Sequence, residues 1–132
     1  MIIFEQLKNF SASEFNHPEK IDVEFLKIVQ EFRDFVNKPI IIHSDFRTNS
    51  QRHASGKALD FRVVGMNVLD MYLSAERFGK FKGIGIYPNW NNPGLHVDIH
   101  KPGRWLAYNS GGRQLYVALN AENLKRYVIS TI

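Results

Sequence analysis

Apolar residues recur every three or four positions in two stretches of the chain, a spacing typical of amphipathic helices. The first stretch, residues 22–36, ends shortly before Pro39, which cannot continue a helix. The second begins after Asn67, a favourable N-cap, and stops at Gly79, a favourable C-cap. We therefore predict two long helices that each turn one face toward a core. The apolar positions that define these faces are Val23, Leu26, Val29, Phe32, Phe35 or Val36, Val68, Leu69, Met71, Tyr72, Ala75 and Phe78.

Shorter apolar runs bounded by turn residues predict strands. Gly83 and Gly85 lie inside one of these runs, where the missing side chains indicate close approach of another backbone. Residues 44–57 are polar, so we expect a loop there. A short helical turn after Phe10 and a closing helix over residues 121–128 complete the pattern. The expected strands are residues 40–43, 58–64, 83–87, 95–100, 105–108 and 115–119.

The order of these elements indicates the fold class. Helices and short strands are interspersed without a strict alternation of strand and helix, which favours an α+β domain. We expect a small domain with a mostly antiparallel sheet and flanking helices. The chain has 132 residues, of which 44% are hydrophobic, and this is enough for one core with little room for a second. Residues 1–132 are therefore predicted to form a single domain.

The composition restricts the chemistry that is available. The chain contains no cysteine, which excludes disulfides and thiolate ligands, so any bound metal must be held by nitrogen and oxygen atoms. Residues 1–8 lack the basic segment and apolar run of a secretory signal, and no apolar stretch approaches the ~20 residues that cross a bilayer. We therefore expect a protein that is made in the cytoplasm and does not insert into a membrane.

The net charge bears on possible partners. A formal charge of +4 and a pI near 9.4 suit an anionic partner. A cell-wall polymer and a nucleic acid both qualify, and the excess of Lys and Arg does not choose between them. The same charge is equally compatible with a solvated basic surface that binds nothing. Charge alone therefore leaves the partner open.

One segment carries two metal-binding side chains, His53 and Asp60, seven residues apart. On a helix these side chains would lie roughly 10 Å apart along the axis. Ligand bonds to zinc are only ~2.0–2.2 Å long, so two side chains placed in this way could not easily meet one ion. Gly56 allows the chain to reverse between them. We therefore expect His53 to come from a loop and Asp60 from the following strand.

A second segment places His96, Asp98 and His100 on one face of a predicted strand, because side chains alternate along a strand. Burying such a polar row without a partner costs free energy, so this face is open to water or faces a site. Taken singly, His53 is an ordinary loop residue, Asp60 a strand-end carboxylate and His96 a sheet histidine. Only the combination of the three favours one zinc site over these plainer interpretations.

Several sequence elements occur together over roughly residues 10–108. They are Phe10-Ser-x-x-Glu14-Phe15, Ser44-Asp-Phe-Arg47-Thr48, His53-x-x-Gly56-x-Ala58-x-Asp60, Gly83-Ile-Gly85-Ile-Tyr87-Pro88, Leu95-His96-Val97-Asp98 and Gly103-Arg104-Trp105. In this combination the chain resembles the zinc D-Ala-D-Ala carboxypeptidase and murein endopeptidase family. The wider superfamily includes the lysostaphin-type peptidases and the hedgehog signalling domain, so the resemblance implies a fold of that kind.

The resemblance implies a zinc ion bound by His53, Asp60 and His96. Three protein ligands leave a fourth position for water, which is the arrangement of a hydrolytic rather than a structural site. Arg47 stands where the family places an arginine that grips a substrate carboxylate or carbonyl, a role that suits a guanidinium fork. The implied activity is hydrolysis of an amide bond in the stem peptide of bacterial peptidoglycan. The enzyme would be a carboxypeptidase or an endopeptidase of cross-links or stems, and we expect a monomer.

Two features depart from the family pattern. Many members place Glu or Asp three residues before the final histidine ligand as the general base, and Pro93 occupies that position here. Asp98 is the natural substitute as base, with His100 a weaker candidate, and Asp98 is equally suited to orient a ligand histidine. The segment between Arg47 and His53 is also shorter than in many relatives, which would widen the cleft or alter substrate choice.

The biological setting and two rival functions follow from the same observations. A wall hydrolase without a secretory signal must await lysis, leave through a holin or travel in a virion, so a phage or prophage lysin is expected. A non-catalytic zinc-containing module that binds cell wall or a protein is the alternative, favoured by the lack of a carboxylate at Pro93. A metal-dependent nuclease is a second alternative, suggested by the pI near 9.4. Few exposed aromatic residues for base stacking argue against it, and no nucleic-acid partner is expected.

Overall fold

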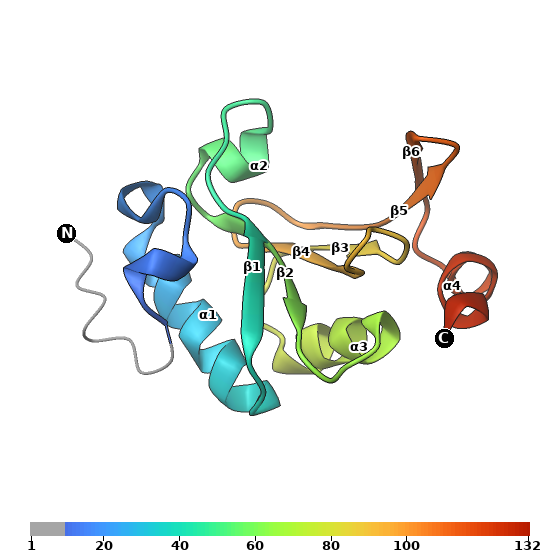
Figure 1. Ribbon diagram of the computed structural model, residues 1–132, viewed down its shortest axis with the longest axis horizontal. Coiled ribbons are helices and arrows are strands. Elements are labelled where there is room, and N and C mark those ends of the chain that lie inside the picture. Colours follow the sequence, from blue (N-terminus) through green and yellow to red (C-terminus); the bar gives the residue numbers. More distant parts are fainter. Residues whose placement is uncertain (1–9) are drawn as a thin grey trace.

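A computed structural model describes residues 10–132 of the chain (Figure 1). The prediction about a secretory signal in residues 1–8 therefore lies outside the described residues. No helix in residues 10–132 is long and apolar enough to cross a membrane. In chain order the elements are the 3₁₀ helices η2 (Ala12–Glu14) and η3 (Pro18–Lys20), then α1 (Val23–Val36), β1 (Ile40–Ser44), α2 (Gln51–Ala54), β2 (Ala58–Val63), α3 (Val68–Phe78), β3 (Gly83–Tyr87), β4 (Gly94–Asp98), β5 (Gly103–Ser110), β6 (Arg113–Val117), α4 (Ala121–Tyr127) and η4 (Ile129–Thr131).

A six-stranded sheet in the order β1-β2-β4-β3-β5-β6 forms the centre of the fold. The pairs β1–β2, β2–β4, β3–β4 and β5–β6 are antiparallel. Only β3 and β5 run parallel, because β4 returns along one side of β3 and the chain then crosses to its other side. The predicted α+β class with a mostly antiparallel sheet is therefore confirmed.

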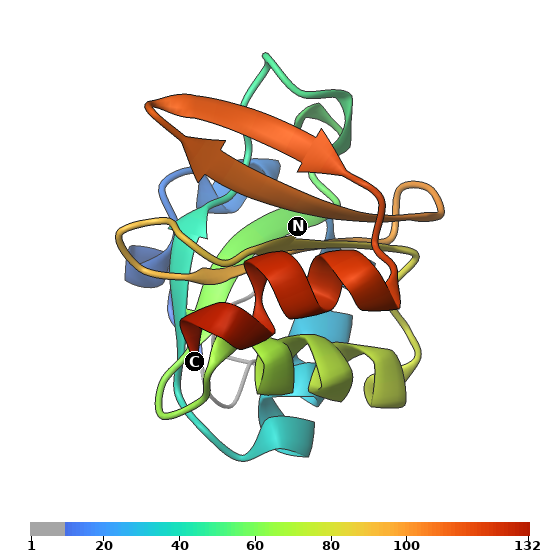
Figure 2. The ribbon, with the colours of Figure 1, turned by 90° about the vertical axis from the view of Figure 1, so that its right-hand side faces the viewer.

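The helices divide unequally between the two faces of the sheet. Helices α1, α3 and α4 lie on one side, whereas α2 lies on the other, toward which the β5–β6 hairpin also curls (Figure 2). The core fills the space between the sheet and the helices. At its centre, the ring of Phe32 packs edge-on against Phe61 at 5.7 Å and against Phe78 and Phe81 at 5.3 Å. Burial of this apolar surface, at about 25 cal/mol per Å², stabilises the helix-covered face and leaves the other face free for chemistry.

Each long helix begins at a capping side chain; the cap at Asn67 confirms the prediction, and the cap at Asp22 was not predicted. The Asp22 side chain accepts the backbone N–H of Phe25, and Asn67 caps α3 in the same way. Gly79 ends α3 in the left-handed region with φ of 76°, whereas α1 ends at Asn37 with φ of 52°. A residue in left-handed geometry therefore ends each helix, and in α1 it does so before Pro39 is reached. Of the two candidates at the end of α1, Val36 packs against the core and Phe35 is 51% exposed.

The loop predicted over residues 44–57 contains one helical turn, α2. Ser50 is its N-cap, and the Ser50 hydroxyl accepts the backbone N–H of His53 at 3.4 Å. A helix of four residues is too short to show a helical repeat of apolar positions, so the sequence pattern could not reveal it. The prediction that His53 comes from a loop is therefore wrong, because this residue belongs to a helix.

Strand β4 ends at Asp98, two residues before the predicted end. The Asp98 Oδ1 atom accepts the backbone N–H groups of His100 at 3.0 Å and Lys101 at 3.2 Å, which turns the chain out of the sheet. His100 is exposed beyond the strand end. The prediction of one shared polar face therefore holds for His96 and Asp98 but is wrong for His100.

Candidate metal centre

Strand register brings the candidate ligands together. Asp60 on β2 lies directly opposite His96 on β4, although the two are 36 residues apart in the chain. Residues that pair in this way project from the same face of a sheet. This face is the one on which α2 lies, and α2 carries His53. Two strands and one helical turn thus contribute one side chain each.

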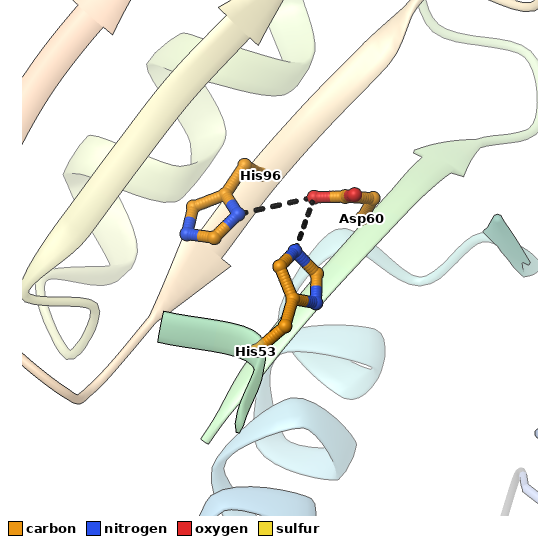
Figure 3. Close-up of side chains that lie close together, drawn as sticks. All are labelled: His53, Asp60 and His96. Carbon is orange, nitrogen blue, oxygen red and sulfur yellow. Dashed lines mark hydrogen bonds and ion pairs between the residues drawn. The ribbon is translucent and has the colours of Figure 1, made fainter. Parts of the chain in front are cut away.

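The three side chains point toward one another (Figure 3). His53 Nε2 lies 3.2 Å from Asp60 Oδ1, and His96 Nδ1 lies 3.0 Å from the same oxygen. One ligand atom from each residue falls within 4.8 Å of the others, and all three residues are buried. The structure therefore assembles the His-Asp-His group that the sequence singled out, in a geometry that could hold a metal ion.

The protonation of His53 favours a cation in this position. Its Nδ1 atom contacts the backbone carbonyl of Asp45, and because a carbonyl can only accept, Nδ1 carries the proton. Nε2 then presents a lone pair, which is buried and forms no hydrogen bond with the described residues. It faces a carboxylate oxygen of Asp60, which is also an acceptor. A buried acceptor without a donor is costly, and a cation shared by the two acceptors removes that cost. The residues present therefore fit a metal.

Electrostatic interactions among these residues keep the Asp60 carboxyl ionised. Burial of the Asp60 carboxyl would raise its pKa, but the two neighbouring histidines, of which His96 forms a hydrogen bond to it through Nδ1, outweigh burial and hold the pKa well below its usual range. Burial of His96 would lower its pKa, but the hydrogen bonds to Asp60 and Asp98 reverse that effect and raise it. Asp60 is therefore an ionised carboxylate, the form that binds a cation.

Asp98 supports His96 from the side away from Asp60. The His96 Nε2 atom donates to Asp98 Oδ2 at 2.6 Å, and Arg52 donates to the same oxygen at 2.8 Å. Asp98 has no exposed surface. Burial would raise the Asp98 pKa, but the hydrogen bond from His96, together with nearby charges that include Arg52, holds it below its usual value. Each ring nitrogen of His96 thus meets a carboxylate oxygen.

Two glycines of β3 make room for these side chains. A Cβ atom on Gly85 would overlap the indole of Trp105, and one on Gly83 would overlap the carboxylate of Asp98 and the guanidinium of Arg52. The prediction of close approach at these glycines is confirmed, but the group that approaches is a side chain and not another backbone. Glycine at these positions lets functional side chains lie flat on the sheet.

An aromatic wall borders His96. The Trp105 ring lies 5.0 Å from the His96 ring and donates from Nε1 to the Tyr87 hydroxyl at 3.1 Å. Burial, the largest influence on Tyr87, raises its pKa, so the hydroxyl stays protonated at neutral pH. The Arg52 guanidinium carbon lies 4.8 Å from the Trp105 ring centroid, a cation–π distance. Arg52 was not predicted for the site, and Tyr87 and Trp105 occurred only in the motifs that carry the family resemblance.

Two hollows border the group, one on the β5–β6 side and one on the β1 side. The first has a volume of about 510 Å³ and the second about 330 Å³. Both are open to solvent and in the size range of small-molecule sites. The first is lined by Arg47, Asn49, Ser50, Arg52, His53, Tyr87, His96, Trp105 and Tyr116. The second is lined by His43, Ser44, Asp60, Trp90, Asn91 and Asn92.

Arg47 lies where the sequence led us to expect a substrate-binding arginine. Its guanidinium donates to Asp60 Oδ2 at 3.1 Å and to the Ser44 hydroxyl at 2.8 Å. The side chain is nevertheless 42% exposed and lines the larger hollow. Arg47 therefore touches a candidate ligand and the solvent-filled space at the same time.

Residues 17–22 form an N-terminal brace behind α2. The buried Asp45 carboxylate accepts the backbone N–H of His17 at 2.6 Å, while the Asp45 carbonyl holds the ring of His53. The Gly56 carbonyl accepts the N–H of Asp22 at 2.9 Å. Gly56 has φ of 73°, and a Cβ there would overlap the carbonyl oxygen of Lys20. The position of His53 therefore depends on a segment some thirty residues earlier.

Comparison with known proteins agrees with this geometry. A family model described as Peptidase M15 matches residues 4–98, a range that contains His53, Asp60 and His96 and ends at Asp98. No curated protein and no solved structure matches the chain.

Proposed function

The chain belongs to the peptidase M15 family, and we propose that it is a zinc-dependent peptidase that hydrolyses an amide bond in bacterial cell-wall peptide. One observation carries the proposal: the buried lone pair of His53 Nε2 meets no hydrogen-bond donor among residues 10–132 and is directed at Asp60. Two imidazoles and one carboxylate are a donor set of catalytic zinc sites, which keep an open position. Family membership supports peptidase chemistry at such a site.

His53, Asp60 and His96 would hold the ion through one ligand atom each. When bound, zinc supplies Lewis acidity, polarising a carbonyl and lowering the pKa of water at its open position to about 7. The Asp45 carbonyl keeps the proton of His53 on Nδ1, so Nε2 is always available as a ligand. His96 offers Nδ1 to the site while its Nε2 donates to Asp98. The Asp45 carbonyl therefore holds His53 in the tautomer that the ion requires, and Asp98 does the same for His96 once Nδ1 gives up its hydrogen bond to Asp60.

Arg47 is the residue that we propose to bind the substrate. Its guanidinium is anchored by Asp60 and Ser44 and still borders the larger hollow, where it can meet a carbonyl or carboxylate of the peptide. Anchoring at one edge fixes the direction of the remaining N–H groups, which is the advantage of a guanidinium fork over a lysine. Such a group positions the substrate and steadies negative charge that develops on its carbonyl oxygen.

For Asp98 the geometry supports an orienting role over that of general base. Its Oδ2 accepts from His96 and Arg52, its Oδ1 accepts from two backbone N–H groups, and the carboxylate is fully buried. A base must reach the proton that it abstracts, directly or through one water. Asp98→Ala separates the two roles. If Asp98 orients His96, this variant should lose zinc affinity by roughly 10–100-fold. If Asp98 is the general base, the variant should keep its zinc affinity and lose most of its turnover.

The two hollows favour a peptide that continues past the cleaved bond in both directions. One hollow lies toward β5–β6 and the other toward β1, with Asp60 and the histidines between them. A carboxypeptidase needs room on one side and a free terminal carboxylate on the other. We therefore propose endopeptidase action on a stem or cross-link, tested by a peptide whose C-terminal carboxylate is amidated. An endopeptidase cleaves both forms, and cleavage of the free acid alone would identify a carboxypeptidase.

The deciding experiment uses the full chain with purified peptidoglycan and defined muropeptides, followed by mass spectrometry of the fragments. We expect one zinc per chain, cleavage that a chelator stops and added zinc restores, and no cleavage by His53→Ala. His100→Ala is the matched control, because His100 is exposed beyond the end of β4 and lines neither hollow, which argues against the role of base considered for it. A chain that binds no metal, or that cleaves equally after chelation, would refute the proposal.

The alternative is a zinc-containing module that binds cell wall or a protein without cleaving it. Pro93 favours this function, because it stands where many relatives carry a carboxylate base. Zinc binding with retention on peptidoglycan but without released fragments is the result expected for the module. A phage or prophage lysin remains the proposed setting, with a monomer as the proposed state.

A further inference from the structure

Arg52 directly precedes the candidate ligand His53 in the chain. Its guanidinium contacts Asp98, which is the hydrogen-bond partner of the candidate ligand His96. Its Nη1 atom donates to Asp98 Oδ2 at 2.8 Å, and Asp98 receives the hydrogen bond of His96. We propose that Arg52 is a positioning residue, which fastens the helical turn carrying His53 to the end of β4 and acts on His96 through Asp98. The inference rests on the proposed function, since it assigns Arg52 a part in the same metal site.

The contacts of Arg52 extend beyond one ion pair. Nη1 also donates to the backbone carbonyl of Lys101 at 2.6 Å, and Nη2 lies 3.4 Å from the carbonyl of Pro102. The side chain is 17% exposed, so solvent screens these bonds only partly. A planar guanidinium can serve a carboxylate and two carbonyls at once, whereas an ammonium group cannot match that fork. Arg52 thus joins α2 to the β4–β5 turn across some 46 residues.

The helical turn α2 needs such a fastening. It contains only four residues, and an isolated helix of that length has no stability of its own in water. The N-terminal brace holds one end of it through Gly56 and the Asp45 carbonyl. Arg52 holds the side that faces β4. Together they fix where His53 meets the two ligands contributed by the sheet.

The sheet is shaped to admit the guanidinium. A Cβ on Gly83 would overlap Arg52 Nη1, and one on Gly103 would come within 2.8 Å of Arg52 Nη2. The Trp105 ring lies against the guanidinium at 4.8 Å. Two glycines and an indole therefore form a slot with a positive charge in it, beside a carboxylate that has no access to water.

The slot also explains how Asp98 keeps its orientation. A buried carboxylate that loses a cationic partner is strongly destabilised, so it turns toward other donors or toward water. Arg52 prevents this by holding Oδ2 at the point where it meets His96 Nε2. A group that accepts from the far nitrogen of a ligand histidine fixes the ring and raises its basicity. Zinc affinity should therefore depend on Arg52 although it is no ligand.

The test compares Arg52→Gln, Arg52→Lys, Asp98→Asn and the double variant Arg52→Gln/Asp98→Asn in the full chain. Zinc affinity is measured by competition with a chromophoric chelator, and the His96 tautomer by imidazole nitrogen NMR of the metal-free protein. We expect Arg52→Gln to weaken zinc binding about tenfold, at the low end of the range for groups behind a ligand, and Arg52→Lys to recover part of it. In the Asp98→Asn background the Arg52→Gln change should weaken zinc binding almost no further, because Arg52 acts on His96 through the Asp98 carboxylate that this background has already lost.

Arg104→Gln is the matched control. Like Arg52, Arg104 links a helix to a strand through an ion pair: it donates to Glu76 at 2.9 Å through two nitrogens, and it also donates to the Lys82 carbonyl at 2.6 Å. It joins α3 to the sheet, as Arg52 joins α2 to the β4–β5 turn. The control should lose less stability, because the Arg104–Glu76 pair is part-exposed, and should keep the zinc affinity and His96 signals of the wild type.

Four results would overturn the inference. Three concern zinc affinity: no change in Arg52→Gln, losses in Arg52→Gln and Asp98→Asn that add fully, or a loss in Arg104→Gln as large as that in Arg52→Gln. The fourth is a raised KM in Arg52→Gln with intact zinc binding, which would make Arg52 a substrate contact. If Arg52→Gln does not fold, Arg52→Lys decides by the same measurements. If the wild type binds no zinc, the proposed function fails, and the His96 signals of the metal-free variants still decide whether Arg52 acts through Asp98.

Discussion

Two rows of residues cross the same four strands of the sheet, one position apart, and they differ in almost every respect. Each row takes one residue from β2, β4, β3 and β5, paired in register. The apolar row faces α1 and α3 and consists of Phe61, Leu95, Ile86 and Leu106, all at most 1% exposed. The polar row faces α2 and consists of Asp60, His96, Gly85 and Trp105.

The difference shows how one sheet serves two purposes. In the apolar row every member gains free energy from burial, and large side chains fill the space against the helices. In the polar row burial is costly and a glycine replaces a side chain. Beside it, His53 Nε2 meets no hydrogen-bond donor in the part of the chain that the structure describes. The apolar row therefore stabilises the fold. That stability offsets the cost of burying, in the polar row, the groups that could hold an ion.

The largest expected effects come from two separate substitutions, one at Leu95 in the apolar row and one at Asp60 in the polar row. Leu95→Ala should lower the free energy of unfolding by about 2–5 kcal/mol, because it leaves a cavity in the core, and should leave one zinc bound per chain. Asp60→Asn should abolish zinc binding at a smaller cost in the metal-free protein, because the amide can still hydrogen-bond the imidazoles. Urea denaturation with chelator present, together with metal analysis, measures both. Equal destabilisation by the two variants would contradict the division of roles.

Metal removal should affect only the polar row. Zinc at 100 times its dissociation constant should add about 2.7 kcal/mol to the wild type by mass action. Leu95→Ala should gain the same increment, whereas His53→Ala should gain none. Thermal or urea unfolding with and without chelator checks this, and an increment that survives in His53→Ala would point to a different metal site.

A methyl group on Gly85 should overpack the polar row, so that this row loses stability in the way that an overfilled apolar core does. Gly85→Ala should cost about 1–3 kcal/mol in unfolding free energy and weaken zinc binding, because its Cβ would displace Trp105 from beside His96. Trp105→Phe in the same chain should recover part of the stability by shrinking the ring. If the second change brings no recovery, the strain lies in the backbone and not at the indole.

The smallest effect is expected outside both rows, at the part-exposed pair of Glu76 and Arg104. The hydrogen bond from Arg104 lowers the pKa of Glu76 more than burial raises it. The pair therefore contributes stability above the ordinary Glu pKa near 4.5, and this contribution disappears as pH falls through the lower pKa of the folded state. Glu76→Gln should remove less than about 1 kcal/mol at pH 7 and converge with the wild type in acid. A gap that widens in acid would contradict this sign.

Much of the fold was predictable because local rules and burial agree along most of the chain. The helix caps at Asp22, Asn67 and Gly79 are set by residues next to them, and the apolar positions of α1 and α3 report their own faces. The candidate ligands were also within reach, because His53 and Asp60 flank a glycine and His96 lies on a strand. Register then brings Asp60 opposite His96, a pairing that an α+β sheet permits but that sequence alone does not choose.

What sequence analysis missed depends on contacts between distant segments. Arg52 has no local signal, since its role arises only when α2 meets the end of β4. Asp45 acts through its backbone carbonyl as well as its side chain, and a carbonyl is present at every residue. The end of β4 was misplaced because the Asp98 side chain accepts two N–H groups that would otherwise continue the ladder. Such features follow from tertiary packing and carry little pattern of their own.

The N-terminal brace has a consequence for protein engineering. A designer who transplanted only the short segments around His53, Asp60 and His96 into a new scaffold would leave behind the Asp45 carbonyl and the chain that presses on Gly56. The grafted imidazole would then rotate freely and spend time with its proton on either nitrogen. A portable version of this centre must therefore include the stretch that begins near His17, which turns a three-residue graft into a graft of some eighty residues.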